Sequence, residues 1–421
     1  MTTVYYASTL FGAMTLAAAM DDGRFTGSGE RLLIVANNSA IPEVATPLDQ
    51  TPGFAVLRER FDRIVSWNEL IAPLHPADWK ARIIEVPMLE RLLASHLRLE
   101  NVEELVLESI AVTPARTIAG LIRDCPITVY ADGLMSYGPT RDPLPAEIFR
   151  RITRLLHLDL VPGLEPLLLS EYGVAAATVP AEPFLRVVDL VAQSAPDMLA
   201  ADAMILGQYL SALDLLTAQE EAELHTDLLR GLVALGHSTV AFKPHPAAGR
   251  RHTQLLRQAA EDVGVRLVVA AGDVPAEVCF AALRPKLVAG CFSTGLATAR
   301  GFFGIPVATH GTDLVLERLK PYENSNRVPA TIADALLPRL SPSGVLAEPP
   351  AVDLGELVRA VGYCMQPETL PGLRPSAAAF VERHGSARYF KKQRLEAVGL
   401  LPAAERPGTL AKIRRRLARA L

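Results

Sequence analysis

Residues Glu104–Tyr130, ELVLESIAVTPARTIAGLIRDCPITVY, indicate the fold class of this 421-residue chain. It holds two short apolar runs, Glu104–Leu107 and Ile127–Tyr130, which predict two buried strands. The residues Thr113–Arg123 between them predict a helix. A strand, a helix and a second strand in this order form the unit from which doubly wound parallel sheets are built.

The same alternation continues on both sides of this unit. In the first half we expect further strands at Val4–Ala7, Arg31–Ala36 and Arg63–Ser66, and helices at Leu10–Met20 and Ala81–Arg98. In the second half we expect strands at Ala203–Leu206, Thr239–Lys243, Leu267–Ala271, Leu287–Ala289 and Pro306–Ala308. The helices expected there are Gln219–Leu235, His252–Val263 and Thr294–Phe303. The chain therefore predicts two α/β units of similar size.

Pro and Gly interrupt the alternation in Leu160–Pro180, so we place a linker from there to about Pro196. This gives three expected parts. They are an N-terminal Rossmann-like domain at 1–195, a second Rossmann-like domain at 196–345, and a helical segment with a basic tail at 346–421.

Composition excludes several classes of protein. Half of the residues are hydrophobic and 21% are charged, which is typical of a folded globular protein. The net charge of −4 provides no overall basic field, so no nucleic-acid partner is expected. No stretch has the roughly 18 clean apolar residues of a membrane span. The apolar segment Leu10–Met20 has no Lys or Arg before it, which argues against a secretory signal.

The four cysteines are scattered, with no metal-ligand spacing, as expected for a reduced cytoplasmic protein with buried thiols. Nor is there an Asp-x-Asp pair suited to Mg²⁺, so we expect no metal site.

The C-terminal end is strongly basic. From Arg388 to Leu421 there are ten basic side chains and two acidic ones, a local net charge of +8. Within residues 407–421, an apolar stripe on an Arg-rich helix consists of Leu410, Ile413, Leu417 and Leu421. One interpretation is peripheral contact with an anionic membrane, at its inner face. The other is a terminal helix that packs on the protein with its arginines outward.

Three segments that follow predicted strands carry candidate functional residues, because open α/β sheets bind ligands at the carboxyl ends of their strands. The first is Val129–Tyr137, VYADGLMSY, in which Asp132 and Gly133 follow a strand. A carboxylate at a strand end can act as a general base. An ordinary Asp-Gly turn is the alternative.

The second segment is Val240–Pro246, VAFKPHP. Its strand leads to Lys243 and His245, and Pro244 and Pro246 restrict the backbone around the histidine. An imidazole held in this way can bind a phosphate or donate a proton. The pair His75-Pro76 follows no clear strand, so the dipeptide alone indicates only a loop.

The third segment is Leu287–Gly295, LVAGCFSTG, which precedes a predicted helix. Ser293 and Thr294 stand where a helix N-cap is expected. A helix N-terminus with free N–H groups and hydroxyls is also a phosphate site. These two interpretations are compatible.

Weaker candidates lie at other strand and helix ends. Glu277 begins a predicted helix and could bind ribose hydroxyls or interact with the helix dipole. Gly207, which ends the first strand of the second half, would allow a ligand to approach the backbone.

Taken in order, the Asp-Gly, His-Pro and Ser-Thr pairs resemble the motif set of bacterial sialyltransferases, and the polysialyltransferase-like branch in particular. The resemblance rests on YADGLMSYG, FKPHP, the PAE before LRPKLVAG, and CFSTG. It spans about residues 131–295 and the segment LGQYLS. It implies a GT-B fold, in which two Rossmann-like domains face a cleft. It also implies inverting transfer from a CMP-activated nonulosonic acid to a glycan hydroxyl, with no metal and no cofactor besides the CMP-sugar co-substrate.

By this resemblance Asp132 is the general base, and His245 contacts the CMP phosphate and acts as general acid. Ser293 and Thr294 correspond to the phosphate-binding hydroxyls, and Glu277 to the ribose-binding acid. The family often has a second acid before the catalytic carboxylate, where this chain has Ala131.

Position alone adds further residues to the site. On the nucleotide side these are Lys243, Pro246, Gly207 and Gln208, and on the acceptor side they are Ser8, Thr9 and Gly133.

Other functions stay open at this point. One is a GT-B transferase that uses CMP-Kdo or a UDP- or GDP-sugar, and another is a polymerase of CMP-linked polyol phosphates. A third is a non-catalytic protein that binds nucleotides or glycans. The preferred setting is the assembly of capsule or cell-wall polysaccharide in a bacterium.

Overall fold

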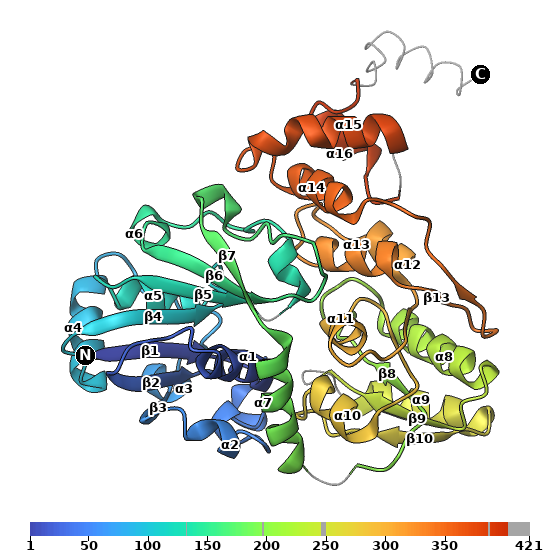
Figure 1. The fold of residues 1–421 in the computed structure, drawn as a ribbon, viewed down its shortest axis with the longest axis horizontal. Helices are drawn as coiled ribbons and strands as arrows, with labels where there is room; N and C mark the ends of the chain where they lie inside the picture. The colour runs from blue at the N-terminus through green and yellow to red at the C-terminus, as the bar shows by residue number, and fades with distance from the viewer. Residues whose placement is uncertain (132, 196–197, 246–249, 386–387, 403–421) are drawn as a thin grey trace, which may run out of the picture.

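The structure is a computed structural model that describes residues 1–131, 133–195, 198–245, 250–385 and 388–402 (Figure 1). It has two large sheets, each with helices on its faces, and a group of C-terminal helices. Among the described helices, none combines the length and the apolar character needed to cross a bilayer. Asp132, Pro246 and the basic tail at 407–421 lie outside the described residues.

The first half contains a sheet of seven strands, all paired in parallel. In spatial order the strands are β3 (Arg63–Ser66), β2 (Glu30–Val35), β1 (Thr2–Ala7), β4 (Val102–Glu108), β5 (Ile127–Ala131), β6 (Ile152–Leu158) and β7 (Ala175–Val179). The helices of this half are α1 (Leu10–Asp21), α2 (Ala55–Arg58), α3 (Trp67–Ile71), α4 (Val86–Leu97), α5 (Ala115–Leu121), α6 (Ala146–Phe149) and α7 (Ala181–Gln193).

The second half contains another sheet of seven strands, in which only the β13–β14 pair is antiparallel. In spatial order the strands are β10 (Arg266–Val269), β9 (Thr239–Lys243), β8 (Ala203–Leu206), β11 (Leu287–Gly290), β12 (Val307–Thr309), β13 (Arg339–Leu340) and β14 (Leu346–Ala347). The helices are α8 (Ala218–Ala234), α9 (Arg250–Asp262), α10 (Ala276–Leu283), α11 (Thr294–Gly301), α12 (Thr312–Arg318) and α13 (Arg327–Leu336).

Both sheets reverse their winding direction at the same relative place. In the first sheet β1 lies between β2 and β4, and in the second β8 lies between β9 and β11. At such a switch point the loops on either side diverge and leave a crevice at the carboxyl ends of the strands. The expected fold of two Rossmann-like domains in a GT-B arrangement is confirmed.

The stretch Leu160–Pro180, where we expected the linker to begin, instead contributes β7, and the sequence analysis also missed β6. The reason is that β7 is an edge strand with the sequence AAATV, in which only Val179 is fully buried. An edge strand exposed in this way needs no apolar run, so its pattern is weak. The first sheet ends with β7 and its helix α7, while the domain boundaries we assigned stay predictions.

Contacts at several places connect the halves. Helix α7 runs between them and packs against α1 of the first half and α10 of the second (Figure 1). The C-terminal helices α14 (Leu354–Met365), α15 (Arg374–His384) and α16 (Lys392–Ala397) follow the second sheet. Just after α14, Gln366 donates a side-chain hydrogen bond of 2.9 Å to the carbonyl of Arg141, in the first half.

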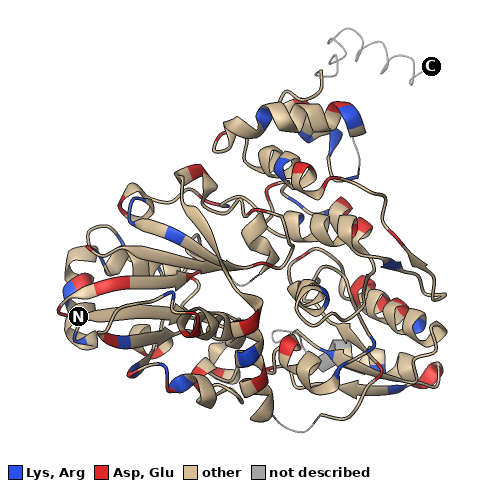
Figure 2. Cartoon of the chain, in the orientation of Figure 1, with Lys and Arg blue, Asp and Glu red and all other residues tan. Residues whose placement is uncertain are grey.

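The interior is mostly apolar, and charges are distributed over the outside of both halves (Figure 2). All four cysteines are buried as free thiols, in agreement with the sequence prediction. Their positions are Cys125, Cys279, Cys291 and Cys364.

Candidate functional site

A cleft of about 660 Å³ lies between the two halves, where the carboxyl ends of the central strands face each other. Its N-terminal wall includes Ser8, Thr9, Glu108, Ala131, Gly133 and Arg141. Its C-terminal wall includes Gly207, Lys243, His245, Glu277, Ser293 and Thr294. Most of the residues that the sequence analysis selected separately are therefore brought together in one cavity.

The loop after β1 forms one edge of the N-terminal wall. The Thr9 hydroxyl accepts a hydrogen bond of 2.9 Å from the Gly12 N–H and so caps α1. The Ser8 N–H donates a hydrogen bond of 2.6 Å to Oε1 of Glu108, at the end of β4. Ser8 and Thr9 line the cleft as expected, and both also hold this loop in place.

The Asp-Gly turn follows β5 at the centre of the same wall. Asp132 lies outside the described residues, but Ala131 and Gly133, which flank it in sequence, both line the cleft. A Cβ atom added to Gly133 would lie 3.0 Å from Oγ1 of Thr294 in the other half, which is tighter than an ordinary contact. Glycine therefore allows the two walls to approach closely here.

Lys243 is buried at the carboxyl end of β9. Its Nζ donates hydrogen bonds to the carbonyls of Pro244 at 2.8 Å and of Gly272 at 2.9 Å. Burial lowers the pKa of the Lys243 ammonium, and the negative charges of neighbours such as Glu277 oppose this effect. Since an ammonium has three donors, one N–H remains beyond these two carbonyls. Lys243 thus fixes the loop and can still reach a ligand.

His245 extends into the open cleft beside Lys243. Its ring is parallel to the ring of Tyr209, with an interplanar angle of 4° and centroids 5.8 Å apart. Desolvation by the surrounding walls lowers the pKa of His245, and the charge of Lys243 lowers it further, while Glu221 raises it. The neighbouring Pro246 lies outside the described residues, so its predicted part in the site is not tested.

The N-terminus of α11 forms the centre of the C-terminal wall. Ser293 is its N-cap, and the Ser293 hydroxyl accepts a hydrogen bond of 3.2 Å from the Gly295 N–H. Thr294 is the first helical residue, and its hydroxyl accepts a hydrogen bond of 3.3 Å from the Leu134 N–H, across the cleft. Both hydroxyls therefore line the cleft at the positive end of a helix dipole, a setting that favours an anion.

Glu277 lies in the first turn of α10, and its side chain is only 4% exposed. Its Oε1 accepts a hydrogen bond of 2.7 Å from the hydroxyl of Thr298, on α11. A buried carboxylate is stable only when hydrogen-bonded in this manner. Thr298 thus holds Glu277 in the wall of the cleft, close to the N-terminus of α11.

Gly207 and Gln208 follow β8, and only Gly207 lies where we expected it, in the wall of the cleft. Gly207 lines the cleft, and a Cβ added there would lie 2.8 Å from the Phe242 ring, so packing against β9 also requires a glycine. Gln208 is not among the residues that line the cleft. Its side-chain oxygen accepts a hydrogen bond of 2.7 Å from the Phe292 N–H and so supports the loop before α11.

Among the charged residues that line the described cleft, the sequence analysis missed three, namely Glu108, Arg141 and Asp273. Glu108 could have been found, because it is the last residue of a strand that we ended one residue earlier, at Leu107. Arg141 and Asp273 lie in loops after the strand ends, where no periodic pattern points to them.

The side chains of the C-terminal wall have the chemistry that a phosphorylated ligand requires. Hydroxyls at a helix N-terminus suit a phosphate, a buried carboxylate suits ribose hydroxyls, Lys243 adds a positive charge nearby, and the imidazole of His245 adds a hydrogen-bonding group. Within the described part of the chain, no three His, Cys, Asp or Glu side chains gather in a way that could hold a metal ion.

Solved structures to which this chain is similar include several glycosyltransferases. The GT-B domain of the sialyltransferase from Photobacterium damselae is 14% identical, with a TM-score of 0.38 over 78% of this chain and 95% of that one. MurG from Acinetobacter baumannii is 10% identical, with a TM-score of 0.40 over 95% of this chain and 99% of that one. UGT2 from Phytolacca americana, solved with UDP-2fluoro-glucose and pterostilbene, is 11% identical, with a TM-score of 0.42 over 94% and 98%.

The search of curated proteins found no match. The family model for alpha-2,8-polysialyltransferases (POLYST), in contrast, matches residues 3–312, which include the strands from β1 to β12 and every cleft residue named above. The sequence motifs had indicated the same family. We conclude that this chain is a glycosyltransferase that belongs to the alpha-2,8-polysialyltransferase family.

Proposed function

We propose that this protein transfers a nonulosonic, sialic-acid-like sugar from a CMP-activated donor to a hydroxyl group of a glycan. The observation that carries the proposal is that residues of both halves line the same cleft. Ser293, Thr294, Lys243 and Glu277 form the nucleotide side, opposite the strand end that leads to the Asp-Gly turn. Membership of the polysialyltransferase family supports the same donor.

The nucleotide binds to the second half in this proposal. The phosphate of CMP lies at the N-terminus of α11, where Ser293 and Thr294 donate hydrogen bonds to it. Glu277 accepts hydrogen bonds from the ribose hydroxyls, and Lys243 offers its remaining N–H. The charge that develops on the leaving phosphate is met by these groups and by His245, so the reaction needs no metal ion.

The acceptor binds to the first half. Asp132 removes the proton of the acceptor hydroxyl, whose oxygen attacks the anomeric carbon of the donor sugar. The bond from that carbon to the phosphate oxygen breaks, and CMP leaves with the electron pair while His245 supplies a proton or a hydrogen bond. A single displacement of this kind inverts the configuration at the anomeric carbon.

For the cellular setting we propose capsule or cell-wall polysaccharide assembly in the cytoplasm, at the inner membrane face. The support is the basic sequence at 407–421. Deletion of residues 407–421 should abolish co-sedimentation with vesicles that contain anionic lipid. Unchanged co-sedimentation would contradict the membrane part of the proposal and leave the transfer reaction standing.

The donor is tested by calorimetric titration of CMP, UMP, GMP and AMP in the presence of EDTA. We expect CMP to bind most tightly, without a divalent ion. As a control, Ser293→Ala combined with Thr294→Ala should weaken CMP binding, because it removes both hydroxyls at the helix N-terminus. Preference for UMP or GMP, or binding that requires Mg²⁺, would contradict the proposed donor.

A further inference from the structure

Glu108 is a buried acid on the acceptor side of the cleft. It ends β4, one strand away from the Asp-Gly turn, and its side chain is only 3% exposed. Burial of a carboxylate costs free energy unless hydrogen bonds compensate it. Its hydrogen-bond partners therefore indicate whether this carboxylate has a structural role or can take up a proton.

One carboxylate oxygen has a structural role. Oε1 accepts the hydrogen bond of 2.6 Å from the Ser8 N–H and so holds the loop that begins α1. A neutral amide could accept the same bond with its own oxygen, so this contact alone does not require an acid.

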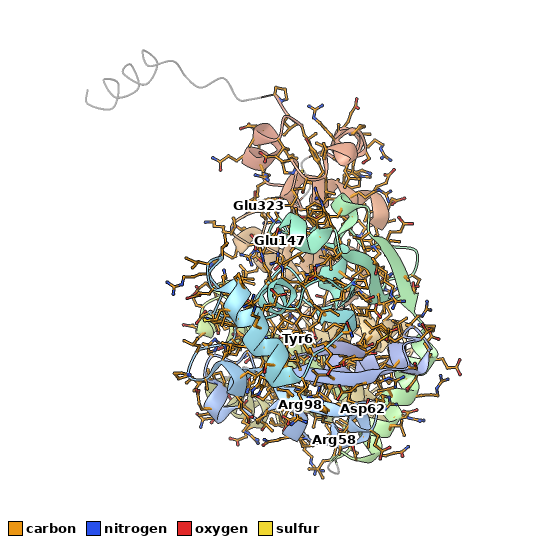
Figure 3. All side chains as sticks on the ribbon, turned by 90° about the vertical axis from the view of Figure 1, so that its left-hand side faces the viewer. Tyr6, Arg58, Asp62, Arg98, Glu147 and Glu323 are labelled. Carbon is orange, nitrogen blue, oxygen red and sulfur yellow. The ribbon has the colours of Figure 1, made fainter. Side chains whose placement is uncertain are left out.

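The other carboxylate oxygen contacts a hydroxyl that can either donate or accept. Oε2 lies 3.2 Å from the hydroxyl oxygen of Tyr130, which is fully buried on β5. The same hydroxyl lies 2.8 Å from the carbonyl oxygen of Tyr6 on β1. Figure 3 looks onto the first half, with Tyr6 near its middle. The carboxylate of Glu108 also raises the pKa of Tyr6, after the larger effect of burial.

This arrangement suits both protonation states of Glu108. A phenol has one proton, and a carbonyl can only accept a hydrogen bond. When the Tyr130 hydroxyl donates to the Tyr6 carbonyl, its lone pair faces Oε2 and can accept a proton held there. When Glu108 is ionised, the hydroxyl can turn and donate to Oε2. The carboxyl group can therefore gain or lose a proton while Tyr130 remains its hydrogen-bond partner.

We propose that Glu108 is a proton-accepting carboxylate of the acceptor side, and that its charge, in addition to its hydrogen bonds, is required for sugar transfer. This inference rests on the proposed function. As the acceptor oxygen bonds to the anomeric carbon and CMP departs with the electron pair, the acceptor hydroxyl loses its proton. Asp132 passes that proton to Oε2 of Glu108, and Glu108 releases it to the water of the cleft after CMP has left, so that both carboxylates are ionised for the next turnover.

The deciding variant is Glu108→Gln. Its amide oxygen can accept from the Ser8 N–H, and its amide nitrogen can donate to the Tyr130 hydroxyl, so the hydrogen bonds of the loop are retained. The negative charge and the ability to take up a proton are lost. Glu103→Gln is the matched control, because it removes one negative charge from an exposed position at the other end of the same strand.

The assay is the rate of transfer from CMP-N-acetylneuraminic acid to an oligosialic acid acceptor, with CMP affinity and thermal unfolding measured in parallel. We expect Glu108→Gln to lower kcat by about 100-fold or more, the range of general-base contributions. The KM for the donor and the affinity for CMP should change less than twofold. Glu103→Gln should match the wild type in all measurements.

A purely structural role for Glu108 predicts a different result, in which Glu108→Gln retains wild-type kcat, and that result would overturn the inference. If Glu108→Gln lowers the unfolding temperature strongly, Tyr130→Phe takes its place. A reduced kcat with unchanged CMP binding in Tyr130→Phe supports the inference, and wild-type kcat contradicts it. Failure of the wild type itself to bind CMP or transfer the sugar refutes the proposed function, which is a separate outcome.

Discussion

The N–H group of Leu134 donates a hydrogen bond of 3.3 Å to the hydroxyl of Thr294. Leu134 belongs to the turn after β5 in the first half, and Thr294 begins α11 in the second. The Thr294 hydroxyl, which lies at the expected phosphate site, thus also connects the two walls of the cleft. We therefore expect ligand binding to the second half to be coupled to the position of the first half through this hydroxyl.

We predict that Thr294→Val opens the cleft and weakens CMP binding. The substitution keeps the size of the side chain but removes the hydroxyl. A neutral hydrogen bond contributes about 0.5–1.5 kcal/mol, or up to about tenfold in an equilibrium constant. The radius of gyration from small-angle scattering should increase, and the CMP dissociation constant should rise by up to about tenfold. Thr294→Ser, which keeps the hydroxyl, should resemble the wild type. Identical behaviour of the two variants would show that the hydroxyl has neither role.

Asp132→Ala should abolish transfer and preserve CMP binding. The proposed base acts only on the acceptor, so its loss should lower kcat by about 100-fold or more. The affinity for CMP, measured by titration, should stay close to that of the wild type. Near wild-type turnover in this variant would refute the assignment of Asp132 as the base.

CMP binding should be accompanied by proton uptake at His245. Burial and the charge of Lys243 lower the pKa of His245, so the free protein holds a neutral imidazole at neutral pH. A bound phosphate favours the charged imidazolium and raises this pKa, and CMP affinity should therefore increase as the pH falls. Calorimetry between about pH 6 and 8, in buffers with different ionisation enthalpies, measures the number of protons taken up. His245→Gln should take up fewer protons than the wild type, and equal uptake would contradict the prediction.

Tyr209 should act on the reaction through the orientation of His245. The two rings are parallel and in contact range, and an aromatic pair contributes about 0.5–1.5 kcal/mol beyond its buried area. We expect Tyr209→Leu to lower kcat by up to about tenfold. Tyr209→Phe keeps the ring and should stay close to the wild type. Comparable losses in both variants would point to the hydroxyl group of Tyr209 rather than to its ring.

Thr298 should control the recognition of ribose through Glu277. The wild type should bind CMP more tightly than 2′-deoxy-CMP, because Glu277 accepts hydrogen bonds from the ribose hydroxyls. Thr298→Val removes the donor that fixes Oε1 of Glu277 and should reduce this preference. The ratio of the two dissociation constants is the measurement, with Thr298→Ser as control. A ratio that is unchanged by Thr298→Val would contradict the prediction that Thr298 orients Glu277 for ribose binding.

The sequence was sufficient to locate the strand-end residues that line the cleft. Lys243 and Ser293 follow continuous apolar runs, and the runs locate the carboxyl ends of strands where α/β proteins bind ligands. The cap at Ser293 was predicted as well, because the preference of helix N-termini for hydroxyl side chains is local.

Features that depend on contacts between residues far apart in the chain could not be predicted from local sequence patterns. The hydrogen bond from Phe292 to the Gln208 side chain satisfies a backbone group of a distant loop, and no local pattern reports that need. The edge strand β7 was missed because exposure on both faces removes the apolar run. Glu108 was missed for a smaller reason, namely a strand end placed one residue too early.

The burial of the four thiols has a practical consequence for experiments on closure. Burial raises the pKa of each of them, to about 11 for Cys279 and about 12 for Cys364, so they react slowly with maleimides. Fluorescent dyes can therefore be attached to introduced cysteines without removal of the native ones. Exposed positions such as Glu147 in the first half and Arg257 in the second suit this purpose. Energy transfer between two such dyes would follow the distance between the walls of the cleft during turnover.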